Sequence, residues 1–454
     1  MPRRLWAILA VAFGVGLSVL DSTIVNVALP TIAGELGVSE SSSIWVVNGY
    51  QLATVMTMLS FSALANQVGV RRIYLLGLSL FTLASLGCFL ARDFASLLAA
   101  RVLQGVGAAA ITSINTTVIR FIYPSDRLGR GMGLNATIVA VASVAGPGVA
   151  SLILSMADWP WLFAINLPIG LVAILLSARF LPDNPERMQG RRFDWRDGVM
   201  NALCFGLLFT VAEAFTRGVS LSLSLPLLLL LLVAGRLFVR SQLRKENPIL
   251  PFDLLRIPIF SFSVATSICS YVAQMSALVA LPFFLQQGLG RSAVDTGLLM
   301  MAWPLVTIFT APLAGRLVER IHAGWLGGVG LLTMALGLYF CSRLVPDDPT
   351  AKVVGALLLS GVGFSFFQSP NNSILVASAP PSRSGSASGM QGTARLVGQT
   401  SGAALVAALF RLYAPAEGSV VVLSAAAALA LLGAGFSFSR LRLPLPEAIR
   451  PKRG

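Results

Sequence analysis

Residues 5–30 read LWAILAVAFGVGLSVLDSTIVNVALP, and Asp21 is their only charged residue. An α-helix that crosses about 30 Å of hydrocarbon needs roughly 20 predominantly apolar residues. This stretch is long enough, and it contains no clear small-residue cleavage site of the kind that ends a secretory signal. The sequence therefore predicts that residues 5–30 form an uncleaved first transmembrane helix.

The rest of the chain repeats this apolar pattern. Hydrophobic residues make up 56% of the 454 residues, charged residues make up only 11%, and the mean hydropathy is +0.79. Soluble domains carry about 25% charged residues, so most of this chain must face lipid or other apolar helices. We expect an all-α integral membrane protein with fourteen transmembrane helices, at residues 5–30, 43–65, 73–91, 95–121, 130–156, 160–180, 198–215, 222–239, 259–287, 296–318, 325–344, 353–376, 387–411 and 418–438.

The distribution of basic residues predicts how these helices are oriented. Of the 33 Lys and Arg residues, Arg101 and Arg395 lie inside predicted helices, and 25 lie in the loops and ends of one side. Because cytoplasmic loops carry the excess of Lys and Arg, both chain ends are expected in the cytoplasm. The six basic residues of the other side are Arg92, Arg217, Arg291, Arg343, Lys352 and Arg411.

Other classes of function find little support in the sequence. The net charge of +14 would suit a nucleic-acid-binding protein, but the basic residues lie in short loops and no nucleic-acid motif is present. The four cysteines are isolated in apolar segments without disulfide or metal-site spacing. The glycine-rich stretches lie inside helices rather than in phosphate-binding loops. We expect no enzyme activity, no metal and no cofactor, with an ion gradient as the energy source.

An internal repeat divides the chain into halves. Gly105-Val106-Gly107 recurs as Gly361-Val362-Gly363, 256 residues and eight predicted helices later. This shift indicates two six-helix halves with two helices inserted between them, an arrangement found in secondary transporters. We expect an N-terminal half at 1–181, a linker with the inserted helices at 182–257, a C-terminal half at 258–440 and a basic cytoplasmic tail at 441–454.

Six motifs follow one another along the chain: LDSTIVNVALP at 20–30, Trp45 with Tyr50 and Leu52, RVLQGVG at 101–107, WPWLFAINLPIG at 159–170, FDW at 193–195 and QSPNN at 368–372. With these motifs the chain resembles, over essentially its whole length, the 14-helix drug:proton antiporter family of the major facilitator superfamily. The resemblance implies a major facilitator fold that exports amphipathic small molecules and drugs in exchange for protons, by alternating access. It also implies a monomer in a bacterial inner membrane, driven by the proton gradient.

Asp21 is the only acidic residue well inside a predicted helix. A buried charge costs at least about 2.5 kcal/mol in a membrane, so an intramembrane acid is by default a functional residue. At 1.5 Å of rise per residue, Asp21 and Arg101 both lie in the outer half of the membrane, within reach of a direct or water-bridged pair. We expect this pair to couple transport to protons. A structural pair that only joins two helices is the alternative.

Polar and aromatic side chains inside the helices are candidates for a substrate cavity. Arg101, Gln104, Thr112 and Asn115 share one helical face, which predicts a polar stripe along a cavity. Arg395 is ambiguous, because it can serve the structure or contact a substrate charge. The predicted cavity residues are Asn26, Tyr50, Gln51, Gln104, Thr112, Asn115, Gln274, Trp303 and Asn371.

Two motifs of the resembled family are altered. The acid and base of motif A, which help to latch the halves of these transporters, are Asn66 and Gln67 in the first copy. The second copy keeps both charges. Motif C, which marks antiporters, is present as Gly146-Pro147-Gly148, although its trailing glycine pair is replaced. The predicted conformational switch comprises Asn66, Gln67, Gly146, Pro147, Glu319 and Arg320.

Two other functions remain open on the sequence alone. An exporter of an endogenous metabolite, lipid or siderophore would use the same fold. A non-transporting membrane sensor or scaffold is the second alternative, although a scaffold has no need for a buried acid or a polar stripe. The substrate itself is not indicated by the sequence.

Overall fold

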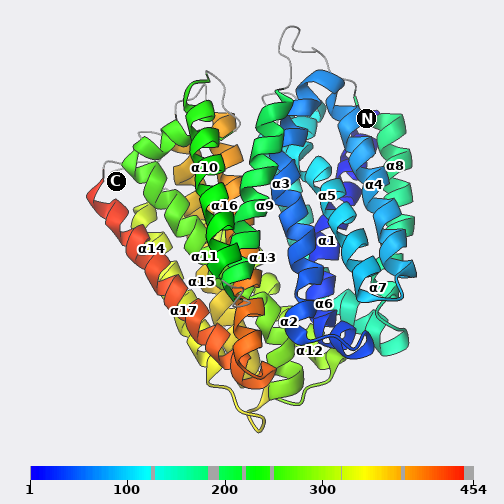
Figure 1. Ribbon diagram of the computed structural model, residues 1–454, viewed down its shortest axis with the longest axis vertical. Coiled ribbons are helices and arrows are strands. Elements are labelled where there is room, and N and C mark those ends of the chain that lie inside the picture. Colours follow the sequence, from blue (N-terminus) through cyan, green and yellow to red (C-terminus); the bar gives the residue numbers. More distant parts are fainter. Residues whose placement is uncertain are drawn as a thin grey trace. The chain divides into compact units, whose positions relative to one another are not determined.

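The computed structural model describes residues 2–123, 128–182, 194–216, 221–245, 250–318, 320–379 and 384–443. These residues are almost entirely helical and contain no β-strand (Figure 1). Each of the fourteen predicted spans lies in helical segments of the structure. The predicted all-α class is therefore confirmed.

Eleven stretches among the described residues are long and apolar enough to cross a membrane. Each of them overlaps one of the fourteen predicted spans. The other three, at 43–65, 198–215 and 387–411, are helical but are not among these eleven stretches. The chain is thus a multi-pass membrane protein by the length and composition of its helices.

The chain divides into two compact units, and the boundary falls within α10 (Leu221–Leu243). One unit comprises Met1–Ala214 and Val219–Ala234, and the other comprises Phe215–Gly218 and Gly235–Gly454. The helices before α10 are α1 (Pro2–Glu35), α2 (Glu40–Ser43), α3 (Trp45–Val68), α4 (Val70–Leu90), α5 (Phe94–Ile122), α6 (Leu128–Met156), α7 (Trp161–Ala164), α8 (Asn166–Phe180) and α9 (Trp195–Thr216). Those after it are α11 (Pro258–Phe283), α12 (Ala293–Met300), α13 (Ala302–Leu317), α14 (Ala323–Ser342), α15 (Thr350–Ala377), α16 (Ser384–Leu412) and α17 (Pro415–Ser439).

Close helix packing explains the glycine pair in α5. A Cβ atom at Gly105 would collide with the carbonyl oxygen of Tyr50 in α3. A Cβ atom at Gly107 would lie 2.6 Å from the backbone nitrogen of Phe81 in α4. Small residues allow this approach, which is how helices associate where lipid removes the hydrophobic driving force. The glycine pair therefore holds α5 against both α3 and α4.

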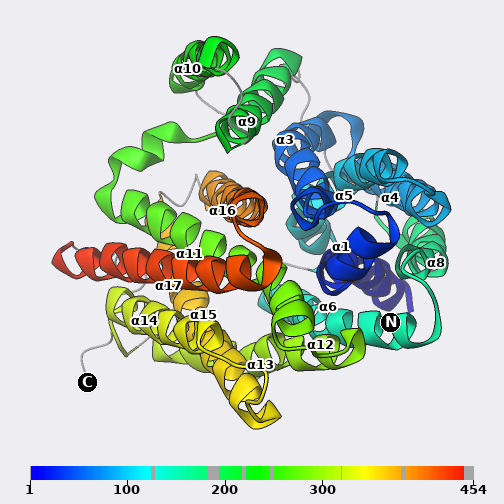
Figure 2. The same cartoon turned by 60° about the horizontal axis from the view of Figure 1, so that its bottom comes forward.

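The repeated glycine pair does the same in the second unit, where α15 packs against α13 and α14 (Figure 2). A Cβ atom at Gly361 would lie 2.6 Å from the carbonyl oxygen of Trp303 in α13. At Gly363 it would collide with the backbone nitrogen of Met334 in α14. The repeat found in the sequence is thus a repeat of helix contacts.

Candidate functional site

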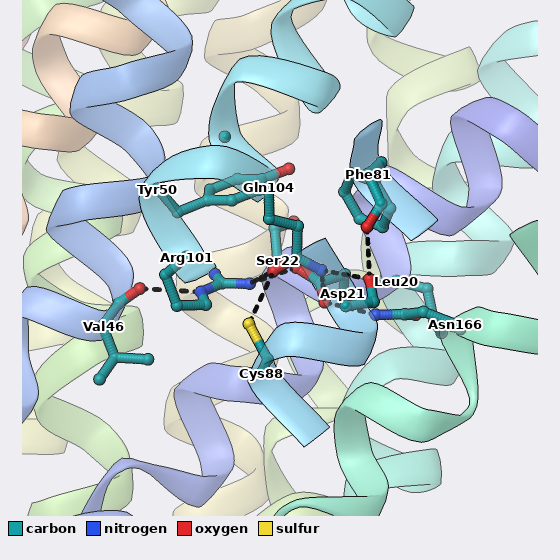
Figure 3. A network of polar contacts seen from close by, with 12 residues as sticks. Leu20, Asp21, Ser22, Val46, Tyr50, Phe81, Cys88, Arg101, Gln104 and Asn166 are labelled. Atoms are coloured by element: carbon teal, nitrogen blue, oxygen red, sulfur yellow. Dashed lines mark hydrogen bonds and ion pairs between the residues drawn. The ribbon is translucent and has the colours of Figure 1, made fainter. Parts of the chain in front are cut away.

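A buried carboxylate lies inside the first unit. Asp21 of α1 is 1% exposed. Its Oδ2 accepts a hydrogen bond from Arg101 Nη1 at 2.6 Å, and the two side chains form an ion pair. Its Oδ1 accepts from Gln104 Nε2 at 2.9 Å and from Asn166 Nδ2 at 2.7 Å. Figure 3 shows these donors, from α5 and α8, converging on the carboxylate. The predicted pairing of Asp21 with Arg101 is confirmed, and it is direct.

The guanidinium of Arg101 is as deeply buried, at 1% exposure. Besides the ion pair, its Nε donates to the carbonyl oxygen of Val46 in α3 at 2.9 Å. The rings of Tyr50 and Phe163 lie with their centroids 4.4 and 5.6 Å from its central carbon. Buried charges persist only when paired and hydrogen-bonded, and aromatic faces attract cations further. Arg101 therefore ties α5 to α1 and α3.

Gln104 lies one turn after Arg101 and is fully buried. Its Nε2 donates to Asp21 and to Ser85 Oγ, the latter at 2.8 Å. Its Oε1 accepts from Arg101 Nη1 at 2.6 Å and faces Cys88 Sγ at 3.7 Å. The sequence suggests Gln104 as a cavity residue. In the structure its amide has no exposed surface, because both ends are bound within this network.

Sequence reasoning missed two members of the network, Asn166 and Ser85. Both side chains are fully buried. Asn166 lies within the motif at 159–170, which contributes to the family resemblance but does not assign a role to Asn166. The available signal was its chemistry, because polar groups at membrane depth need partners and tend to face other helices. This signal marks Asn166 as a polar residue that needs a partner, but it does not identify Asp21 as that partner.

The remaining stripe residues of α5 have other partners. Thr112 Oγ1 donates to a carbonyl one turn earlier in its own helix, at 2.8 Å. Asn115 Nδ2 donates to Asn135 Oδ1 of α6 at 2.9 Å. Two further predicted cavity residues, Asn26 in α1 and Gln51 in α3, are buried at 4% and 7% exposure. The polar residues of this face of α5 therefore have three kinds of partner. Arg101 and Gln104 bind Asp21, Thr112 bonds within α5, and Asn115 binds α6.

The predicted switch residues of motif C lie at a close helix contact. A Cβ atom at Gly146 in α6 would collide with Thr23 Oγ1 in α1. Pro147 follows within the same helix, where proline removes a backbone hydrogen bond. The small residue brings α6 close to α1, near the network around Asp21.

The predicted switch residues of motif A are only partly described. Gln67 is half-buried near the end of α3, and Arg320 is exposed in the turn after α13. The side chain of Asn66 and the whole of Glu319 lie outside the described residues. The role of these four residues stays a prediction.

A second buried polar cluster surrounds Arg440, which follows α17 and is 0% exposed. Its Nη1 donates to Asn371 Oδ1 of α15 at 2.6 Å and to Ser263 Oγ of α11 at 3.0 Å. Its Nη2 donates to Ser437 Oγ at 2.5 Å. Asn371, a predicted cavity residue, is fully buried because it binds Arg440 and donates to Ser267 Oγ at 2.7 Å. The burial of Arg440 is not indicated by the sequence, in which Arg440 begins a basic terminal segment.

Three predicted residues of the second unit lie outside the Arg440 cluster. Gln274 of α11 and Arg395 of α16 are half-buried. Trp303 of α13 is 3% exposed.

Comparison with known proteins agrees with this architecture. A family model described as the Major Facilitator Superfamily matches residues 11–403. The chain belongs to this superfamily. Members of the major facilitator superfamily are membrane transporters, so the coarse functional class predicted from the sequence is confirmed.

Individual members of the superfamily resemble the chain over most of their length. The uncharacterized transporter YebQ of Escherichia coli is 53% identical, covering 94% of this chain and 93% of its own. The riboflavin transporter RibZ of Clostridioides difficile is 30% identical, covering 90% and 89%. The multidrug resistance protein Stp of Mycobacterium tuberculosis is also 30% identical, covering 89% and 75%. Among solved structures, a bacterial homologue of the human lysosomal transporter Spinster aligns with a TM-score of 0.70 at 17% identity, covering 97% and 98%. This last likeness concerns the fold.

Proposed function

We propose that this facilitator exports amphipathic small molecules, drugs among them, in exchange for protons. The observation that carries the proposal is the buried network around Asp21, whose carboxylate is bound by three donors from two other helices. A proton on this carboxylate would cancel the charge that holds Arg101. Because Arg101 also binds α3 through Val46, protonation would alter how α1, α3 and α5 are held together. That is the link between a proton and a conformation that an antiporter needs.

The remaining features of the proposal follow the resemblance. Transport would proceed by alternating access, with the proton gradient as the energy source and no bound cofactor. The chain would act as a monomer in a bacterial inner membrane, with both ends in the cytoplasm. Drug export is supported by Stp, which is named as a multidrug resistance protein.

A test uses purified protein in vesicles with an acidic lumen and a pH-sensitive dye inside. Ethidium, a monovalent aromatic cation, is added outside. An antiporter should raise the luminal pH on addition, whereas protein-free vesicles should not respond. An unchanged luminal pH with a broad panel of amphiphiles would contradict proton exchange.

Export of an endogenous metabolite is the second candidate, because RibZ is named as a riboflavin transporter. In the same vesicles, riboflavin replaces ethidium. A pH change with riboflavin and none with ethidium would favour the metabolite over drugs.

Rigid dications are expected to be poor substrates. Asp21 is already paired with Arg101, and Arg395 and Arg440 add positive charge to the helices of the second unit. A dication would leave at least one of its charges unpaired in a low-dielectric setting, at a cost of several kcal/mol. Monovalent and uncharged amphiphiles avoid this cost.

The measurement compares export of a matched series of mono- and bis-quaternary compounds of similar size. The bis-quaternary members should be exported much more slowly. Equal handling would contradict the argument and would indicate a further carboxylate at the substrate, with Glu213 as the first residue to replace.

A further inference from the structure

Arg395 of α16 carries a donor that no part of the described chain satisfies. Its side chain is half-buried, yet its Nε is shielded from solvent and has no hydrogen-bond partner among the described residues. A buried donor without an acceptor is costly, and more so when it is charged. The Nε groups of Arg101 and Arg440, by contrast, both donate to backbone carbonyl oxygens, of Val46 and Ser437 respectively. Arg395 is therefore not explained by a structural role of the kind that these two have.

Arg395 lies beside Tyr271 of α11. One turn further along α16, a Cβ atom at Gly398 would lie 2.6 Å from Tyr271 Cβ, so the two helices meet at this level. The Tyr271 hydroxyl accepts a hydrogen bond from Gln368 Nε2 of α15 at 3.1 Å. Within the described residues nothing accepts the hydroxyl's own proton, so Tyr271 presents a second unused donor.

Tyr271 belongs to a cluster of aromatic rings that also contains Trp303, whose indole N–H is a third unused donor. The Tyr271 ring packs edge-on against Phe364, with centroids 5.8 Å apart, and Phe364 lies 6.5 Å from Trp303. The Nε1 of Trp303 is buried and has no partner among the described residues. Tryptophan normally pairs this group when it is buried. The second unit thus places a buried cluster of aromatic rings beside three donors that lack acceptors among the described residues.

We propose that Arg395, Tyr271 and Trp303 recognise an aromatic molecule that carries a carboxylate. Aromatic side chains bind flat aromatic ligands by stacking or by edge-to-face contact. A guanidinium binds a carboxylate through charge-assisted hydrogen bonds. Hydroxyl and indole N–H groups supply further donors to acceptor oxygens. The inference rests on the proposed transport function, and it adds aromatic amphiphiles with one negative group to the expected substrates.

The test measures equilibrium binding to the purified protein in lipid nanodiscs, without a proton gradient. Anthracene-9-carboxylate and its uncharged primary amide, anthracene-9-carboxamide, are compared by fluorescence anisotropy. The wild-type protein should bind the carboxylate roughly tenfold more tightly or better, as expected for a hydrogen bond to a charged group. Equal binding of the two compounds, or binding of neither, would overturn the proposal without any variant.

Variants identify the residue responsible. Arg395→Gln should remove the preference by weakening only the carboxylate, and Arg395→Lys should retain part of it because the charge remains. Tyr271→Phe should reduce the preference by a few fold while it keeps the ring. Arg343→Gln makes the same change in charge at an exposed position at the end of α14, and it should leave both affinities unchanged.

If Arg395→Gln and Arg395→Lys each weakened the binding of both compounds equally, Arg395 would have a structural role and the proposed site would be overturned. The binding measurement is independent of proton coupling. Loss of proton exchange with the carboxylate preference intact would therefore contradict the proposed antiport alone.

Discussion

Replacing Asp21 with asparagine is expected to abolish proton-driven export. Asparagine keeps the size of the side chain but removes the group that can carry the coupling proton. It also leaves the buried Arg101 without its counter-ion, and breaking a buried ion pair costs about 3–5 kcal/mol. Export in the vesicle assay should fall to the protein-free level. The thermal unfolding temperature should fall as well.

A second variant separates coupling from stability. Asp21→Asn combined with Arg101→Gln removes both charges and should recover much of the lost stability, because a buried pair can often be replaced without penalty. It should still fail to exchange protons. Asp347→Asn, at an exposed position, is the matched control for loss of an acid. Proton-coupled export by the double variant would rule out Asp21 as the coupling residue.

Gly363→Ala is expected to be strongly destabilising although it adds a single methyl group. The new Cβ would collide with the backbone of α14 at Met334, so α14 and α15 would have to separate. Overpacking of this kind costs about 1–3 kcal/mol even where side chains can adjust, and here the obstacle is backbone. A lower unfolding temperature and a smaller yield of monodisperse protein are expected in detergent.

Gly355 provides the control within the same helix. A Cβ atom at Gly355 meets nothing within 4 Å. Gly355→Ala should therefore be neutral, or stabilising by about 0.5–1 kcal/mol because alanine favours helix more than glycine does. Similar behaviour of the two variants would contradict the role assigned to the glycine pair.

The Asp21–Arg101 pair is predictable from the sequence for two reasons. A charged residue in an apolar helix is energetically costly unless it has a partner, and the rise per residue of a helix places Asp21 and Arg101 in the same half of the membrane. The sequence does not predict the rest of the network. Which neutral side chain reaches Asp21 depends on how each helix is rotated, and this is set by packing contacts such as that of Gly105 with Tyr50. The sequence therefore predicts Gln104 as a cavity residue and predicts no role for Asn166.

Arg440 shows a different limit of sequence reasoning. Arg440 lies two residues before Arg442, so in the sequence it looks like part of a basic segment that follows the last helix. Its burial depends on space provided by α14, where a Cβ atom at Gly327 would lie 3.2 Å from Arg440 Nη2. This space depends on how the helices pack, so it cannot be predicted from the residues around Arg440.

The repeat of helix contacts also bears on the energy available for transport. At the offset of 256 residues that relates the glycine pairs, Arg101 corresponds to Leu357 and Gln104 to Ser360, both fully buried. The second copy keeps the packing but cannot rebuild the charge network at this place. The described residues contain one such network, so under the proposed exchange we expect one proton to be exchanged for each molecule exported. Export of an uncharged compound then moves one charge across the membrane, worth about 2.3 kcal/mol per 100 mV. Export of a monoanion moves two, so an anionic substrate draws twice as heavily on the electrical part of the gradient.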